Sequence, residues 1–161
     1  MLIEKNKFIY MDSSDISLIT TKDLQKVFDL MISLWGSKVY SDNDLLMIIN
    51  HNLSYCIRIL GDIIAICFIR RDKSTKGTLF IFAVKKEYQR KGLGTRLLTF
   101  CIDKAKENGI KSISLHVQVQ NEPAINLYKK CGFAITKTTK RYYTKKDYPT
   151  NQDAYLMTIQ I

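Results

Sequence analysis

Proline is scarce in this chain, which has only two prolines among its 161 residues, and no repeat or low-complexity stretch interrupts the sequence. Without a proline-rich or repetitive linker, nothing in the sequence divides the chain into separate folding units. A length of 161 residues is enough for one domain with a buried core. We therefore expect a short N-terminal extension over residues 1–14 and a single domain over residues 15–161.

Long apolar runs are missing as well. No stretch approaches the roughly 20 consecutive apolar residues that a membrane span needs. Residues 1–7 also lack the order of basic, apolar and small residues that marks a secretory signal. These absences predict a protein of the cytoplasm or the nucleus that has no membrane partner.

Cysteine occurs four times, but no two cysteines form a Cys-x-x-Cys pair. Neither His51 nor His116 lies at a metal-ligand spacing from them, so we expect no metal site. His51 lies between two asparagines and is expected at the surface. We interpret the cysteines as small, reduced, buried hydrophobes: Cys56, Cys67, Cys101 and Cys131.

The net charge of +10 is concentrated in one part of the chain. Residues 85–146 carry a net charge of +11, and the remainder carries −1. Three interpretations are open: a ligand with several phosphates, a nucleic acid, or a basic surface that is simply solvated.

Hydrophobic periodicity predicts an alternation of strands and helices, in the order β-α-α-β-β-β-α-β-α-β-β. Gly61 and Asp62 form a two-residue hairpin signal. The strand over residues 111–119 alternates, with His116 and Gln118 on the polar face. The last helix is expected to bury Ala124, Leu127, Tyr128 and Cys131. Strands are expected at residues 15–20, 55–60, 63–69, 78–84, 111–119, 134–142 and 154–161, and helices at 22–35, 42–49, 95–108 and 123–131.

The most informative segment is Gln89-Arg90-Lys91-Gly92-Leu93-Gly94, which lies between an expected strand and an expected helix. Glycines allow the backbone to turn so that successive N–H groups point inward, and the helix N-terminus adds a partial positive charge. This arrangement suits a pyrophosphate. An ordinary turn is the alternative for Gly92 and Gly94.

The segment resembles the Gln-x-x-Gly-x-Gly motif of the GNAT superfamily of acetyl-CoA-dependent N-acetyltransferases, matched by Gln89, Gly92 and Gly94. Residues 121–133 resemble a second family segment, which contains an Asn, a Tyr and a final Gly-Phe. The resemblance covers residues 15–161. It implies an α/β (α+β) GNAT fold: a mixed, mostly antiparallel sheet of about seven strands, a central parallel βαβ pair that splays apart, and about four helices.

The resemblance narrows to the catalytic subunits of protein N-terminal acetyltransferases of the NatE type. Residues 115–118 followed by Asn121 are similar to that group, as are the paired Tyr142 and Tyr143 followed by residues 153–157. The resemblance implies that these tyrosines cover the incoming peptide and that Tyr40 lies in the opposite wall. Two departures are Thr78, where NatE-type enzymes carry a tyrosine proposed as a catalytic partner, and the absence of their Phe-Pro-Val segment.

The resemblance also assigns roles at the cofactor site. Asn121 would hydrogen-bond the pantetheine arm of coenzyme A, with a plain helix cap as the alternative or additional role. Tyr128 would bind the cofactor and serve the departing thiolate, with core packing as the alternative. The remaining cofactor-binding residues would be Phe82, Ala83, Val84, Gln89, Arg90, Lys91, Gly92, Leu93, Gly94 and Thr95.

His116 is the candidate general base, because a histidine near its usual pKa of about 6.5 accepts a proton at neutral pH. A structural, hydrogen-bonded histidine is the alternative. The expected reaction is direct attack of a protein or peptide N-terminal amine on acetyl-CoA, with an auxiliary subunit or the ribosome as further partners.

Acetylation of a lysine side chain or of a small amine such as a polyamine stays open, although a polycation would need an acidic cleft. A nucleic-acid or scaffold module is the non-enzymatic alternative, and it would require neither of the two family motifs.

Overall fold

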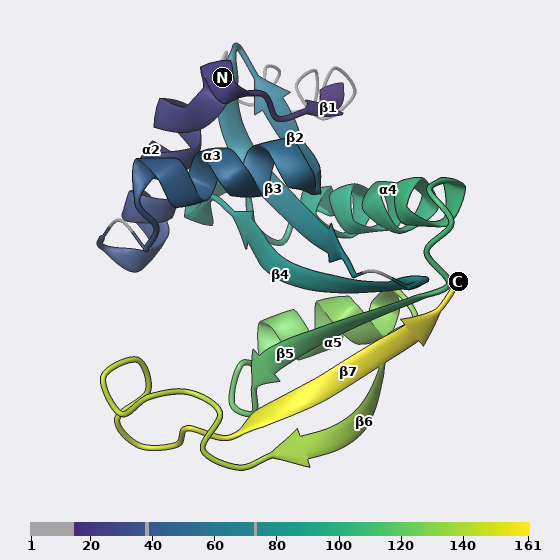
Figure 1. Ribbon diagram of the computed structural model, residues 1–161. Coiled ribbons are helices and arrows are strands. Elements are labelled where there is room, and N and C mark those ends of the chain that lie inside the picture. The colour runs from purple at the N-terminus through teal and green to yellow at the C-terminus, as the bar shows by residue number, and fades with distance from the viewer. Residues whose placement is uncertain (1–14, 38, 73) are drawn as a thin grey trace, which may run out of the picture. The chain divides into compact units, whose positions relative to one another are not determined.

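The computed structural model describes residues 15–37, 39–72 and 74–161, in which the elements follow one another in the expected order (Figure 1). The predicted extension over residues 1–14 lies outside the described residues. The described part contains seven strands, four helices and two short 3-10 turns, η1 and η2. The elements are β1 Asp15–Leu18, η1 Thr21–Asp23, α2 Leu24–Trp35, α3 Asp42–His51, β2 Leu53–Ile59, β3 Asp62–Arg71, β4 Lys76–Val84, η2 Lys86–Tyr88, α4 Leu93–Glu107, β5 Ser112–Gln118, α5 Glu122–Lys130, β6 Ala134–Thr139 and β7 Ala154–Gln160.

The strands form one mixed sheet in the order β1-β2-β3-β4-β5-β7-β6. β4 pairs with β5 in parallel, from Lys76 opposite Ser112 to Thr78 opposite Ser114. The pairs β1–β2, β5–β7 and β6–β7 are antiparallel. The mixed α/β sheet with a parallel βαβ connection confirms the predicted fold class.

The described residues group into two compact units. One contains the chain up to Phe68 together with Ile81–Leu97, and the other contains Ile69–Phe80 and Leu98–Ile161. β3, β4 and α4 each contribute residues to both units. In the first unit the central strand β3 is buried on both faces from Ile63 to Phe68, and α2 buries Val27, Phe28 and Met31.

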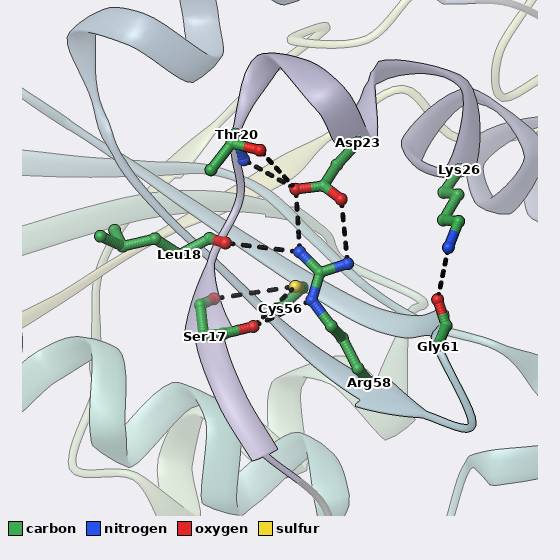
Figure 2. A network of polar contacts seen from close by, with 8 residues as sticks. All are labelled: Ser17, Leu18, Thr20, Asp23, Lys26, Cys56, Arg58 and Gly61. Atoms are coloured by element: carbon green, nitrogen blue, oxygen red, sulfur yellow. Dashed lines mark hydrogen bonds and ion pairs between the residues drawn. The ribbon is translucent and has the colours of Figure 1, made fainter.

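A polar network ties β1, η1 and β2 together in the first unit (Figure 2). The Arg58 guanidinium donates to both carboxylate oxygens of Asp23, at 2.9 and 2.8 Å. Asp23 also accepts from the backbone N–H of Thr20 at 2.8 Å and from its hydroxyl at 3.1 Å. The remaining Arg58 donors reach Ser17 Oγ and the Leu18 carbonyl. The network therefore anchors the first described strand to the sheet.

The hairpin between β2 and β3 turns one residue earlier than the sequence predicted. Leu60 and Gly61 have φ of 50° and 84°, and Asp62 already belongs to β3. Two successive residues with positive φ match the right-handed twist of a hairpin, which explains this shift. The Lys26 ammonium donates to the Gly61 carbonyl at 2.6 Å and fastens the turn to α2.

In the second unit, β5 is paired along its whole length with β7, and His116 lies opposite Leu156. β5 buries Ile113, Leu115 and Val117, as its alternation predicted. Gln118 departs from that pattern, because it is only 3% exposed and uses its side chain in hydrogen bonds.

The buried side of α5 also differs from the prediction. Ile125 and Tyr128 are buried, whereas Ala124, Leu127 and Cys131 are only half-buried. The helix begins at Glu122 and has only nine residues. A helix this short buries only a narrow stripe of side chains against the rest of the unit.

Candidate active site

The Gly-containing loop predicted to bind phosphate follows the end of β4 in the first unit. After η2 the backbone takes positive φ at Arg90 (58°) and again at Gly92 (80°). The Gly92 carbonyl then accepts the N–H of Arg96 at 3.0 Å, which closes the first turn of α4. Loops of this kind, followed by the free N–H groups at the start of a long helix, are the type of structure with which proteins bind anions.

Side chains of this loop stabilise it from within. Gln89 donates from Nε2 to the Val84 carbonyl at 2.8 Å, which ties the loop to the end of β4. The Lys91 ammonium donates to the Glu87 carbonyl at 2.5 Å and lies 5.3 Å from the centre of the Tyr88 ring. Lys91, which the sequence predicted at the phosphates, thus fixes the loop in this structure. A Cβ built on Gly92 would meet nothing within 4 Å, so the space beside it is open.

His116 and the two predicted substrate-binding tyrosines come together in the second unit. The His116 ring stacks on the Tyr142 ring, with centroids 4.0 Å apart and planes inclined by 10°. Tyr143 meets Tyr142 edge to face at 4.9 Å, and its hydroxyl donates to the His116 carbonyl at 3.4 Å. The positions 116, 142 and 143 in the sequence do not by themselves show that these three side chains touch.

These tyrosines lie on the tyrosine loop, residues 140–153, which joins β6 to β7 and is yellow-green in Figure 1. The predicted strand through Tyr142 ends instead at Thr139, because Arg141 has a φ of 51° and turns the chain. Tyr148 packs on Tyr143 with ring centroids 4.7 Å apart, and this third tyrosine was missed by sequence reasoning.

Two further polar residues hold the tyrosine loop, and sequence reasoning missed both. Asp153 accepts from the Lys140 ammonium at 2.7 Å and from the Arg141 N–H at 3.0 Å. Gln118 donates to the Asn151 carbonyl at 3.0 Å. The sequence shows Gln118 as a polar residue at the end of an apolar strand, and this pattern is equally typical of an exposed side chain.

The surroundings of His116 suit a proton acceptor. Burial lowers the pKa of His116 below its usual value, which keeps the imidazole neutral at physiological pH. No side chain among the described residues hydrogen-bonds to either of its ring nitrogens. Burial, with Tyr148 and Tyr142 nearby, raises the pKa of Tyr143, so this phenol stays protonated. A neutral imidazole of this kind can take a proton from an amine.

Asn121 and Tyr128 both occupy structural positions in α5. The Asn121 side chain caps the helix by accepting the Ala124 N–H at 3.3 Å. Tyr128 is 8% exposed and meets the edge of the Phe133 ring at 5.9 Å. The helix-cap and packing roles considered for them are therefore present, and a role toward a cofactor would be an additional one.

The other predicted site residues are divided between the two units. The first unit contains Tyr40, residues 82–84 and residues 89–95, and burial raises the pKa of Tyr40. Thr78 belongs to the second unit, where it pairs with Ser114, two residues before His116.

Neither a membrane-spanning helix nor a metal-binding cluster is found in the part of the chain that the structure describes. No helix there is long and apolar enough to cross a bilayer. The described residues also contain no group of three or more His, Cys, Asp or Glu side chains that could hold a metal ion.

Comparison with known proteins gives consistent matches. A family model described as "Acetyltransferase (GNAT) family" matches residues 23–133. The [Ribosomal protein bS18]-alanine N-acetyltransferase of Escherichia coli is 30% identical over 150 residues, which cover 91% of this chain and 97% of that protein.

Two further matches carry names of the same kind. An N-alpha-acetyltransferase of Sulfurisphaera tokodaii is 42% identical over 83 residues, which cover 51% of this chain and 47%, about half, of that protein. The solved structure of Arabidopsis thaliana Naa50 in complex with the bisubstrate analogue CoA-Ac-MVNAL has a TM-score of 0.80 at 25% identity, covering 92% of this chain and 99% of that one.

Proposed function

This chain belongs to the GNAT family of acetyltransferases, and from that premise we propose that it acetylates the α-amino group at the N-terminus of a protein or peptide. The protein is an acetyltransferase, and its cofactor is acetyl-CoA. The choice of a peptide α-amine as the acceptor rests on the cluster of His116, Tyr142 and Tyr143. This cluster combines a neutral base with aromatic side chains that would frame an extended peptide.

The loop after β4 fits the pyrophosphate of coenzyme A. Positive φ at Arg90 and Gly92 turns the backbone, and the open space beside Gly92 leaves room for a phosphate. The backbone N–H groups from Arg90 to Thr95 would hold the phosphates, with Gln89 bracing the loop. When bound, acetyl-CoA supplies an acetyl thioester whose carbonyl carbon accepts the attacking amine as the thiolate leaves.

The chain's own residues manage the protons of this reaction. His116 accepts a proton from the α-ammonium, directly or through one water, so that the nitrogen lone pair becomes available. Tyr128 donates a hydrogen bond or a proton to the thiolate. Tyr142 covers one face of the imidazole and holds the ring in place.

Charge supports a peptide N-terminus over a polyamine. The tyrosine loop beside His116 has four cations and only two carboxylates, and one of these carboxylates, Asp153, is already paired with Lys140. The net charge of this loop is therefore positive, which disfavours a polycation. Relatives named N-alpha-acetyltransferase and ribosomal-protein alanine N-acetyltransferase support the same choice. Such an activity would place the enzyme in the cytoplasm, where new protein N-termini emerge from the ribosome.

The direct test measures acetyl transfer to four acceptors: a peptide with a free α-amine, the same peptide with a blocked α-amine and one lysine, spermidine, and buffer alone. We expect turnover with the free α-amine only. Comparable turnover on the lysine or on spermidine would contradict the proposal.

A pair of histidine variants tests the role of His116. His116→Phe should lower kcat by about 100-fold or more, the usual contribution of a general base, while calorimetry still detects acetyl-CoA binding. His51→Phe is the matched control, because His51 is exposed at the end of α3. Unchanged turnover in His116→Phe would remove this residue from the reaction.

A further inference from the structure

The tyrosine loop carries an excess of positive charge. Its cations are Lys140, Arg141, Lys145 and Lys146, and its only carboxylates are Asp147 and Asp153, so its net charge is +2. The contacts of the two carboxylates show which cations are paired within the loop.

Both carboxylates are used to shape the loop. Asp147 accepts the Thr144 hydroxyl at 2.6 Å, and its own N–H donates to Thr144 Oγ1 at 3.2 Å. Asp153 takes the Lys140 ammonium and the Arg141 N–H. Lys140 is therefore neutralised within the loop.

Three cations have side chains that form no ion pair among the described residues: Arg141, Lys145 and Lys146, which we call the basic patch. All three are exposed. The charge of Arg141 still helps to lower the pKa of Asp153, so the two lysines carry most of the charge that is available to a ligand in solution.

The tyrosine loop, which carries the basic patch, is held against His116 by its tyrosines. The Tyr143 N–H donates to the Gln152 carbonyl at 2.9 Å, and Gln152 Nε2 donates to the Tyr148 carbonyl at 2.6 Å, so the loop is cross-linked by hydrogen bonds. Arg141 directly precedes Tyr142, whose ring stacks on the imidazole at 4.0 Å. Lys146 is three residues beyond Tyr143, a backbone reach of at most about 11 Å.

An extended peptide whose α-amine meets His116 also rises by about 3.3 Å per residue. Its third to sixth residues then lie roughly 7–20 Å from the reacting nitrogen, a distance that the backbone of the tyrosine loop and the long side chains of the patch can span. At this range an exposed charge still acts at low ionic strength, where the screening length is about 10 Å or more.

We propose that the basic patch selects peptide substrates with Asp or Glu at the third to sixth positions. This inference rests on the proposed N-terminal acetylation and adds the class of peptide. The patch acts on binding rather than on chemistry, because none of its three side chains belongs to the proton-transfer cluster. Its effect should therefore appear in KM and not in kcat.

The first experiment uses three peptides that share their first two residues and differ at positions three to six, which are acidic, neutral or basic. At about 20 mM NaCl we expect a KM about 4-fold lower for the acidic than for the neutral peptide, roughly twofold for each of two exposed charge pairs, and a KM raised for the basic peptide. At about 500 mM NaCl the three KM values should converge. Equal KM values at low salt would overturn the inference and leave N-terminal acetylation intact, whereas no turnover on any peptide would overturn both.

The second experiment reverses the patch. Lys145→Glu combined with Lys146→Glu should invert the preference toward the basic peptide, with kcat for the neutral peptide unchanged within about twofold. The matched control is Lys106→Glu combined with Lys111→Glu, which makes the same change in net charge. Both control lysines are exposed and lie outside the tyrosine loop, Lys106 in α4 and Lys111 one residue before β5.

The control should keep the wild-type preference. An equal change in both double variants would show a general effect of net charge and would overturn the inference. Loss of salt-sensitive binding to a ribosomal RNA fragment in the Lys145/Lys146 variant, with unchanged peptide kinetics, would also overturn it and would mark the patch as a nucleic-acid surface.

Discussion

Removing the Asp23 carboxylate should weaken the fold more than any ordinary surface ion pair would suggest. Asp23 joins Arg58 of β2 to the turn before α2, and its side chain is 12% exposed while that of Arg58 is 24% exposed (Figure 2). The carboxylate accepts two hydrogen bonds from Arg58 and two from Thr20. Asp23→Ala eliminates all four and leaves a largely buried guanidinium without its counter-charge.

The expected magnitude lies between the two known limits for ion pairs. Exposed pairs contribute about 0–1 kcal/mol, and breaking a fully buried pair costs about 3–5 kcal/mol. Arg58 keeps Ser17 Oγ and the Leu18 carbonyl as partners and remains a quarter exposed. We therefore expect Asp23→Ala to cost about 2–3 kcal/mol of unfolding free energy, of which about 1.5–2 kcal/mol is coupling to Arg58.

A double-mutant cycle in urea measures this coupling from Asp23→Ala, Arg58→Ala and the combination. The exposed pair Lys104–Glu107, with its ammonium and carboxylate 2.6 Å apart, provides the control cycle, and its coupling should be about 0.3–0.5 kcal/mol. A coupling at Asp23 and Arg58 no larger than that of the control would refute the reasoning.

The pH dependence gives an independent check. Burial raises the pKa of Asp23, but the hydrogen bonds from Arg58 and Thr20 outweigh it and leave the pKa below its usual value. The ionised carboxylate therefore adds stability at pH values above the unfolded pKa of about 3.9, and this is lost as the pH falls through the lower folded value. The advantage of the wild type over Asp23→Ala should shrink below about pH 4.

Three further predictions concern the site and its supports. Because burial lowers the pKa of His116, kcat at saturating peptide should fall at acidic pH with a midpoint below about pH 6.5. A midpoint above about pH 7 would contradict a neutral base. Gly92→Glu should abolish acetyl-CoA binding in calorimetry, because the new carboxylate repels the phosphates. The control Gly61→Glu, at a turn with similar φ and equally open space, should bind acetyl-CoA normally. Equal affinities of the two variants would refute the loop assignment. Gly132→Ala should destabilise the fold by about 2 kcal/mol or more, since its Cβ would lie 3.0 Å from Ile159 Cδ1 at a φ of +94°. Gly36→Ala, with positive φ but no neighbour within 4 Å, should cost only about 1 kcal/mol in the same thermal or urea unfolding assay.

The order of elements and the turn between β4 and α4 followed from the sequence alone. Helical spacing in residues 24–35 and 93–107 and alternation in β5 come from local periodicity, which one segment specifies without its neighbours. The loop motif is likewise local, because positive φ near a glycine and a following helix need only consecutive residues. The cap of α3 is equally local, because the Ser41 hydroxyl accepts the Asp44 N–H three residues along the chain.

Errors arose where a residue's role depends on a distant partner. Gln118 was placed on the polar face of its strand, but Asn151, 33 residues away, satisfies its side chain and makes burial favourable. The strand expected through Tyr142 ends at Thr139 because Asp153 captures the N–H of Arg141.

The sequence by itself determined the fold class, and it also predicted the cofactor loop and His116 as the candidate base, since each of these depends mainly on neighbouring residues. Only the tertiary structure decided that Tyr142 covers His116, that Tyr148 supports Tyr143, and that Asp153 pairs with Lys140 rather than with the other cations of the loop. Those facts depend on which groups meet across β5, β7 and the tyrosine loop. Contacts of that kind depend on hydrogen-bond and packing partners that are far apart along the chain, which local periodicity does not encode.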